Sequence, residues 1–490
     1  MGTETPAVYI GVDVGSTTTK AIAFGENGES LAVGSQGYAI SRPRPGWAVQ
    51  DAREWFDAVD ASVAALAETV DLGTVRSIGI TSQVDTHIFV DEALEPVTEA
   101  FSWQDVRCAA EVDAVNERLG EAGRIAEWGA PDPLDASNPV PRALWLAAND
   151  PAAWARTRWV LFPKDYVNAR LTGSVATDPF ASFKTATPVP DYVLGVAGAP
   201  GLPERLAPLQ WPEEVVGRTL ADWHGVPAGT PMATGSMDGM GNTLGSGLRE
   251  PGDAMVILGT SVIGGSVGVG GTSGPGVANF APYRGRQVHA GPTQSGGDSL
   301  RWWAGISGRS IDDVIAAAAD SPPGANGVMF APHLLGERAP LWDADVRGWF
   351  LGLSAGSGFA DLSRAVLEGI ACSARELMDA VDVAASVPST VATLSGGGSQ
   401  SPLWCQIVAD VTGREMRRSV EKDTAVVGAA VFAAAVDTGA DPWDASRRLV
   451  VHDAVFEPSA DNSACYEELY ALYRQSYAAL REVHARMRPE

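Results

Sequence analysis

The chain has 490 residues, of which 45% are hydrophobic and 19% charged, so it can bury large cores, and its length favours two or more domains. Its 35 basic and 60 acidic residues leave a net charge of −25, which disfavours nucleic acid and anionic membranes as partners, since both are bound through clustered Lys and Arg. There is no Cys-x-x-Cys pair among the four cysteines, no basic segment before the N-terminal apolar stretch, and no apolar run of the roughly 20 residues that span a bilayer. We therefore expect a soluble cytoplasmic protein.

The first forty residues carry strand signals. An apolar run over residues 8–14 breaks at Gly15, and two further apolar runs, residues 20–24 and 30–33, flank a second turn at residues 26–29. Hydroxyl residues surround Gly15, so the predicted hairpin presents backbone N–H and hydroxyl groups to phosphate oxygens. Asp13 and Lys20 beside this turn provide an acid and a cation, which suits a metal-bound phosphate.

An α/β pattern follows. Residues 51–70 have apolar side chains at helical spacing, and residues 75–81 and 87–91 return to strand patterns. His87 lies near the end of these strands, but a lone histidine is more often a structural hydrogen-bond partner than an acid–base group. Proline and glycine cluster over residues 188–231, which predicts an irregular insertion or linker.

Residues 233–241 place Asp238 between glycines at the predicted start of a helix. Helix-end amides can hold such an aspartate while its other oxygen accepts the proton of an alcohol, as a general base requires. The structural alternative is an N-cap aspartate with structural glycines. The position of Asp238 shortly before a second turn of the phosphate-binding type favours the functional interpretation.

That second turn repeats the first. An apolar run over residues 255–258 breaks at Gly259, continues through Thr260 and Ser261, and then resumes. A boundary at residues 245–252 would divide the chain into two related domains that hold one polyphosphate.

A glycine run at residues 396–398 lies between a predicted strand and a predicted helix, and bare backbone there lets a nucleotide base or ribose approach closely, although a triple glycine alone is more often a flexible loop. Helical periodicity covers residues 361–383 and 446–488. The sequence lacks a Walker-type P-loop, a Ser-His-Asp arrangement and Cys/His metal spacing.

Together these motifs resemble the FGGY family of carbohydrate kinases, within the actin-like ATPase superfamily, over residues 9–436. The matching blocks, in the order of the family, are residues 13–20, 137–146, 235–238, 259–261, 332–340 and 395–410. The resemblance implies an α/β fold of two actin-like (ribonuclease H-like) domains, residues 1–250 and 251–490, with a central nucleotide cleft. The first domain would hold the sugar and the second the nucleotide.

The resemblance also implies roles for individual residues in a phosphoryl transfer from ATP. Asp238 matches the catalytic base, and Asp13 matches the acid that organises Mg²⁺. The positions that match substrate contacts are Asp85, Trp103 and Gln104, with Asp105 as a further polar contact. The positions that match nucleotide and phosphate contacts are Thr17, Lys20, Thr260, Gly297, Gly397 and Ser401. For Trp103 alone, core packing is the structural alternative.

The substrate is less clearly indicated. Val84 and Asp85 match neither the Arg-Glu pair of glycerol kinases nor the Met-His pair of xylulokinases, and Arg142 stands where the family signature usually has Lys. Residues 163–166 resemble xylulokinases and gluconokinases. We therefore expect an open-chain ketopentose as the substrate, with D-xylulose as the first candidate.

Several alternatives stay open. A polyol such as erythritol or glycerol, or an aldonate such as gluconate, would use the same chemistry. A non-catalytic sugar sensor or actin-like scaffold is the alternative of another class, which the set of Asp13, Asp238 and Thr260 disfavours. A chaperone-type ATPase would need a separate peptide-binding domain after residue 440. The family is often dimeric, so a homodimer is also an open alternative.

Overall fold

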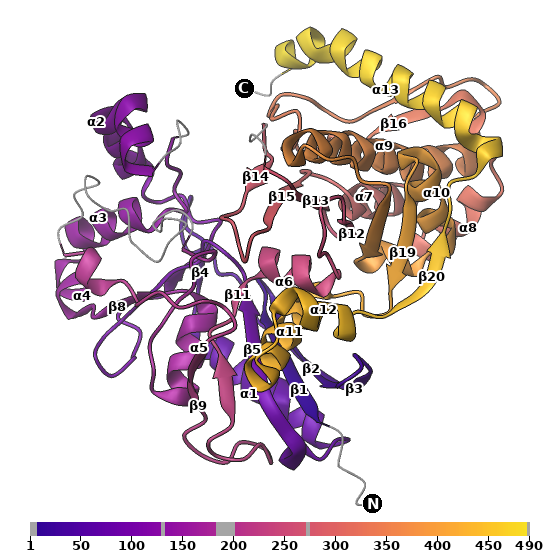
Figure 1. Cartoon of the computed structure of the whole chain (residues 1–490). Coiled ribbons are helices and arrows are strands. Elements are labelled where there is room, and N and C mark those ends of the chain that lie inside the picture. Colours follow the sequence, from indigo (N-terminus) through magenta and orange to yellow (C-terminus); the bar gives the residue numbers. More distant parts are fainter. Residues whose placement is uncertain (1–6, 129–132, 183–200, 271–274, 488–490) are drawn as a thin grey trace, which may run out of the picture. The chain divides into compact units, whose positions relative to one another are not determined.

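The computed structural model describes residues 7–128, 133–182, 201–270 and 275–487 (Figure 1). The chain forms two compact units. Unit 1 comprises residues 1–245 and 425–450, and unit 2 comprises residues 246–424 and 451–490. This division differs from two continuous halves because a late segment of the chain belongs to unit 1.

Unit 1 contains a sheet with the strand order β3-β2-β1-β5-β10-β9, and β11 pairs with β5. Strands β1, β2 and β3 form an antiparallel meander, whereas β5 runs parallel to β1. The strands are β1 (Val8–Val14), β2 (Thr18–Gly25), β3 (Ser30–Gly37), β5 (Val75–Ser82), β9 (Val215–Arg218), β10 (Pro231–Ala233) and β11 (Ser236–Met237).

Helices cover both faces of β1. Side chains alternate along a strand, and Ile10 and Val12 pack with Trp55 and Val63 of α1 (Ala52–Ala67) in one buried cluster. The Gly11 between them faces α11 (Thr424–Thr438), where a Cβ atom would lie 2.2 Å from the carbonyl oxygen of Val426. Figure 1 shows α11, orange as a late part of the chain, beside the indigo strands.

Close contact with the sheet explains why residues 425–450 return to unit 1. Gly79 of β5 makes the same kind of approach as Gly11, since its Cβ would lie 1.8 Å from the carbonyl oxygen of Ala429. Helix α11 is apolar on all sides and buried, as expected of a core helix. The remaining elements of unit 1 are β4 (Val49–Gln50), β6 (Ile88–Val90), β7 (Ala100–Phe101), β8 (Trp159–Leu161), α2 (Ala109–Trp128), α3 (Pro139–Asn149), α4 (Pro151–Arg156), α5 (Pro163–Thr172), α6 (Asp238–Gly245) and α12 (Pro442–Leu449).

Unit 2 has a sheet with the strand order β14-β15-β13-β12-β18-β19-β20. Strand β12 is antiparallel to β13 and parallel to β18, as β1 is to β2 and β5. Each unit therefore contains a hairpin joined to a parallel strand, and this common arrangement confirms the predicted pair of α/β domains. The strands are β12 (Ala254–Leu258), β13 (Val262–Gly268), β14 (Ala278–Asn279), β15 (Gln287–Pro292), β16 (Met329–Ala331), β17 (Trp349–Leu351), β18 (Val391–Ser395), β19 (Glu415–Ser419) and β20 (His452–Phe456). The α-helices are α7 (Gly297–Ser307), α8 (Ile311–Ala319), α9 (Phe359–Ala385), α10 (Pro402–Thr412) and α13 (Ala460–Arg486).

One local prediction was wrong, and a second was confirmed only in part. The helical stretch expected over residues 446–488 is interrupted by β20, because the edge of β19 offers unpaired backbone groups and β20 pairs with it in antiparallel fashion. The expected irregular segment over residues 188–231 contains β9, which pairs with β10. Residues 188–200 of that segment lie outside the described residues.

In the described part of the chain, no single helix is both long and apolar enough to cross a membrane. Helices α11 and α12 meet that test of length and composition only as a pair bent by 119°.

Candidate active site

Three acidic residues of unit 1 lie at one end of its sheet, at or just beyond the ends of β1, β5 and β11. Thr81 of β5 pairs with Asp13 of β1 on one side and with Ser236 of β11 on the other. Asp238 follows β11 directly and begins α6, and Asp85 follows the end of β5. Because parallel strands present their carboxyl ends at one edge of a sheet, the fold brings together the predicted base, the predicted magnesium ligand and one predicted sugar contact.

Asp238 has the electrostatic properties expected of a base. Its Oδ1 accepts a hydrogen bond of 2.8 Å from the backbone N–H of Gly239. Desolvation, together with the negative charges of Asp13 and Asp85, raises the pKa of its carboxyl to about 7. The side chain keeps partial access to solvent. A carboxyl whose pKa lies near neutral pH is suited to accept a proton there.

The β1–β2 turn lies next to these acids. The N–H of Gly15 donates to the carbonyl oxygen of Thr18 at 3.1 Å and closes the turn, and Thr17 is exposed. Lys20 of β2 is the cross-strand partner of Asp13, so the acid and the cation both lie beside this turn.

The donor set around Asp13 fits Mg²⁺. Asp13 is partly exposed, and its Oδ1 accepts a hydrogen bond of 2.9 Å from the Thr81 hydroxyl. Within the described residues, no group of three or more His, Cys, Asp or Glu side chains could hold a metal ion by itself. Mg²⁺ is commonly bound through one or two carboxylates, substrate phosphates and water, and Asp13 near Asp238 would supply the carboxylates of such a site.

The predicted sugar contacts have different surroundings. Trp103 is 43% exposed, which disfavours core packing, and its Nε1 donates to the Ser16 hydroxyl at 3.0 Å. The side-chain oxygen of Gln104 accepts from Arg42. Asp105 is buried, and its carboxylate binds the Arg107 guanidinium at 2.6 Å. Because the carboxylate of Asp105 is buried and already binds Arg107, we infer that Asp105 has a structural role rather than a role in sugar contact.

A chain of hydrogen bonds joins the β1–β2 turn to Trp103, and sequence reasoning missed it. Gln50 donates to the Ser16 carbonyl oxygen at 2.8 Å, and Gln83 donates to Gln50 at 2.9 Å. The Thr86 hydroxyl donates to Gln83 at 3.2 Å and accepts from the backbone N–H of Trp103 at 3.1 Å. Gln50 belongs to no motif, and its burial next to the turn is the only feature that indicates its role. The network connects the β1–β2 turn to the segment before Trp103.

Unit 2 contains a cavity of about 700 Å³, within the range of small-molecule sites. Thr260, Gly297, Gly397 and Ser401 all line it, so the fold brings these four predicted nucleotide contacts together. Thr17 and Lys20 are residues of unit 1 and do not line this cavity. The other lining residues are Leu258, Gly259, Leu300, Arg301, Ile311, Asp312, Ile315, Ala316, Gly398, Gln400, Pro402 and Trp404.

Local geometry explains how these residues form the cavity wall. The Gly297 N–H donates to the Gly259 carbonyl oxygen at 2.9 Å, which ties the start of α7 to the β12–β13 turn. A Cβ atom on Gly397 would meet no other atom within 4 Å, so bare backbone faces open space there. Sequence reasoning missed Arg301, whose guanidinium donates to the Thr260 hydroxyl at 3.0 Å, because it belongs to no recognised motif.

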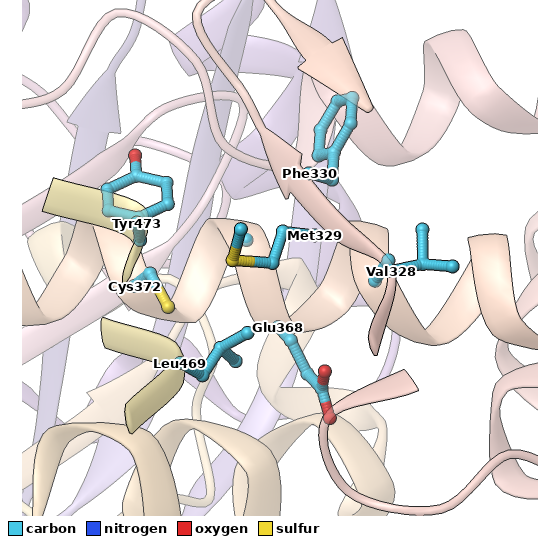
Figure 2. Close-up of a pocket in the computed structure, with 9 residues that line it drawn as sticks. Val328, Met329, Phe330, Glu368, Cys372, Leu469 and Tyr473 are labelled. Carbon is cyan, nitrogen blue, oxygen red and sulfur yellow. The ribbon is translucent and has the colours of Figure 1, made fainter. Parts of the chain in front are cut away.

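A second, small cavity lies in unit 2 between α9, β16 and α13 (Figure 2). Its volume is about 10 Å³, room for about one water molecule. Glu368 at its wall accepts hydrogen bonds from Arg364 at 2.8 Å and from Tyr466 at 2.9 Å. The cavity is too small for a sugar or a nucleotide.

Comparisons with known proteins agree with this geometry. Residues 8–245 match the N-terminal domain of the FGGY family of carbohydrate kinases, and residues 281–436 match its C-terminal domain. The xylulose kinase of Klebsiella pneumoniae is 30% identical over 98% of both chains. The gluconokinase of Bacillus licheniformis is 26% identical over 95% of this chain and 94% of its own. The crystal structure of xylulose kinase from Rhodospirillum rubrum superimposes with a TM-score of 0.83 at 26% identity and covers 97% of this chain and 99% of that one. The chain is therefore a phosphotransferase that uses ATP, and it belongs to the FGGY family of carbohydrate kinases.

Proposed function

We propose that the enzyme phosphorylates an open-chain ketose, and that a pentulose such as D-xylulose is its preferred substrate. The observation that carries the catalytic part of this proposal is the Asp238 carboxyl, whose pKa is raised to about 7 beside Asp13. The similarity to the xylulose kinase of Klebsiella pneumoniae supports the pentulose. The similarity to a gluconokinase supports an aldonate as the second candidate.

In the proposed reaction, Asp238 accepts the proton of the sugar hydroxyl. The hydroxyl oxygen forms a bond to the γ-phosphorus of ATP, and the bond from that phosphorus to ADP breaks. Mg²⁺ held by Asp13 would neutralise charge on the phosphate oxygens, to which Thr17 and Lys20 would also bind. Such reactions are catalysed largely by positioning and charge stabilisation.

We propose binding roles for the other predicted residues on the same basis. Asp85, Trp103 and Gln104 would contact the sugar. The cavity of unit 2 would hold the nucleotide through Thr260, Gly297, Gly397 and Ser401. We also propose that the enzyme works in the reducing cytoplasm, which fits its four free cysteines, Cys108, Cys372, Cys405 and Cys465.

The direct test measures ADP release by the purified protein with Mg-ATP and a panel of ketopentoses, ketohexoses, polyols and aldonates. Turnover with one ketopentose at a kcat/KM well above those of the other compounds supports the proposal. A preference for gluconate or another aldonate would replace the pentulose by the second candidate. The absence of turnover with every compound would contradict the proposed function.

The pH dependence of the reaction tests the base. Because the pKa of Asp238 is raised to about 7 in the ligand-free protein, the carboxyl is protonated and inactive as a base below that pH. We expect kcat/KM for the sugar to rise with pH and to level off above an inflection at about 7. Initial rates between pH 5.5 and 9 measure this profile, and a flat profile from pH 5.5 to 8 would exclude Asp238 as the titrating base.

Gly397→Val tests the nucleotide cavity. Its side chain would enter open space at the cavity wall without a clash in the protein. We therefore expect weaker ADP binding, by about tenfold or more, which corresponds to about 1.4 kcal/mol, with little change in thermal stability. Titration calorimetry with ADP measures the effect. Gly305→Val is the matched control, because Gly305 is exposed on α7 and a Cβ there also meets no atom within 4 Å. Equal ADP affinities of the two variants would contradict this nucleotide site.

A further inference from the structure

Arg142 lies near the start of α3 and is fully buried, and its guanidinium binds backbone carbonyl groups of three separate segments. Its Nε donates to the Ala136 oxygen at 2.9 Å. Its Nη1 donates to the Asp85 oxygen at 2.6 Å and to the Phe101 oxygen at 3.1 Å. Its Nη2 donates to the Ser102 oxygen at 2.7 Å. One side chain thus connects the segment of Asp85, the segment that precedes Trp103 and the loop before α3.

The same guanidinium also contacts His87. Nη1 of Arg142 lies 2.6 Å from Nδ1 of His87. Because a guanidinium has donors and no acceptor, Nδ1 is the acceptor in this contact, and the two N–H groups of Nη1 are shared among His87, Asp85 and Phe101. Burial lowers the pKa of Arg142, and the charge of Asp85 opposes that change. An arginine remains charged at neutral pH nevertheless.

The backbone at Asp85 has an uncommon conformation. Its φ angle is +59°, in the left-handed region that few residues other than glycine adopt. A conformation of this kind persists only where the surrounding structure holds it. Arg142 binds the carbonyl oxygen of Asp85, and the Ser137 hydroxyl lies 3.3 Å from its Oδ2. The direction of the Asp85 carboxylate is therefore tied to these two contacts.

We propose that Arg142 is a positioning residue of the sugar site, which sets the affinity and the preference of the enzyme for its sugar by fixing Asp85 and the backbone before Trp103. The inference rests on the proposed function, in which Asp85 and Trp103 contact the sugar. A lysine, which the family signature usually has at this position, would keep the positive charge, but its three donors lie on one nitrogen and lack the planar fork with which Arg142 spans carbonyl groups on three segments of this chain.

The kinetic test uses Arg142→Lys. Since a misplacement of about 1 Å can cost on the order of 100-fold, we expect the KM for the sugar to rise about 10- to 100-fold, with a smaller change in kcat and an unchanged KM for ATP. The matched control is Arg364→Lys, because Arg364 is also buried and binds Glu368 and Tyr466 in unit 2. This control should lose thermal stability but keep the sugar KM. An unchanged sugar KM in Arg142→Lys, or an equal rise in both variants, would overturn the proposal.

A double variant separates positioning from a general loss of structure. If Arg142 acts through Asp85, the substitution Arg142→Lys should raise the sugar KM much less in an Asp85→Ala background than in the wild type. If the increase in sugar KM in the double variant equals the product of the increases in the two single variants, Arg142 and Asp85 act independently, contrary to the proposal.

Hydrogen–deuterium exchange tests the positioning without any sugar. We expect backbone amides of residues 84–87 and 101–104 to exchange at least tenfold faster in Arg142→Lys than in the wild type and in Arg364→Lys. Unchanged exchange in these segments would overturn the positioning role. Turnover of the wild-type enzyme on the sugar panel decides the proposed function separately, so the two failures are distinguishable.

Discussion

Replacing Asp238 with asparagine is expected to lower kcat for sugar phosphorylation by about 100- to 10 000-fold, the usual contribution of a positioned general base. Asparagine keeps the shape of the side chain and its place at the start of α6, but it cannot accept the proton of the sugar hydroxyl. ADP binding should change little, because the cavity proposed for the nucleotide is lined by residues of unit 2. Coupled assays of ADP release and calorimetry with ADP measure both quantities. Turnover near the wild-type rate would show that Asp238 is not the base.

The same substitution should stabilise the ligand-free protein above neutral pH. The folded-state pKa of Asp238 is about 7, against an ordinary value of 3.8, so the folded state binds a proton that the unfolded state releases. Ionisation of Asp238 therefore lowers the free energy of unfolding of the wild type progressively as pH rises from about 4 to 7. At about 1.36 kcal/mol per pH unit the loss is at most about 4 kcal/mol, and partial exposure to solvent reduces it. The variant avoids this loss because asparagine does not ionise.

Thermal unfolding at several pH values measures this gain. The midpoint of Asp238→Asn should exceed that of the wild type at pH 8, and the difference should become small near pH 4. The control is Asp57→Asn, since Asp57 is exposed on α1, and a surface substitution of this kind usually changes stability by no more than about 0.5 kcal/mol. If the unfolding midpoint of Asp238→Asn at pH 8 is lower than that of the wild type, Asp238 is not destabilised by desolvation and by the nearby negative charges.

Replacing Lys164 with methionine is expected to lower the free energy of unfolding by about 3–5 kcal/mol, as the removal of one partner from a buried ion pair usually does. Lys164 is fully buried at the start of α5, and its Nζ lies 2.6 Å from an oxygen of Asp165 and 3.0 Å from an oxygen of Asp178. The substitution leaves two buried carboxylates without their cation. Asp178 also accepts a hydrogen bond of 2.7 Å from the Ser236 hydroxyl, just before Asp238, so the variant should lose activity as well.

The loss caused by Lys164→Met should depend on pH. Desolvation already raises the pKa of Asp165 against the opposing effect of Lys164, and without the ammonium group this pKa should rise further. A carboxyl with a raised folded-state pKa binds more protons in the folded state, so the deficit of the variant is largest above that pKa and shrinks as pH falls. Denaturant unfolding at pH 5.5 and 8 measures this difference. Lys422→Met, at an exposed lysine, is the matched control, and equal stabilities of the two variants would contradict a stabilising role of the buried charges.

Much of the fold follows from local patterns. The apolar runs that break at Gly15 and Gly259 predicted two hairpins of the same kind, and the structure has both, each joined to a parallel strand. Glycines around Asp238 predicted its place at the start of a helix, because such residues favour helix ends. The resemblance to the FGGY family, carried by these same short blocks, then predicted the family that the comparisons confirm.

Other features depend on residues that are far apart in the sequence. Helix α11 joins unit 1 because Gly11 and Gly79 leave room for its backbone against the sheet. No sequence pattern near residue 425 predicts that contact. β20 is a strand because β19 offers it an edge.

The site shows the same division. The sequence by itself determined the local turns that carry Asp13, Asp238 and the glycines of unit 2. These turns depend on hydrogen bonds and on backbone freedom between residues that are neighbours in the chain. Only the tertiary structure decided the raised pKa of Asp238 and the bracing of Asp85 by Arg142. Desolvation and charge interaction depend on distance in space, and folding sets those distances through contacts between segments that the sequence keeps apart.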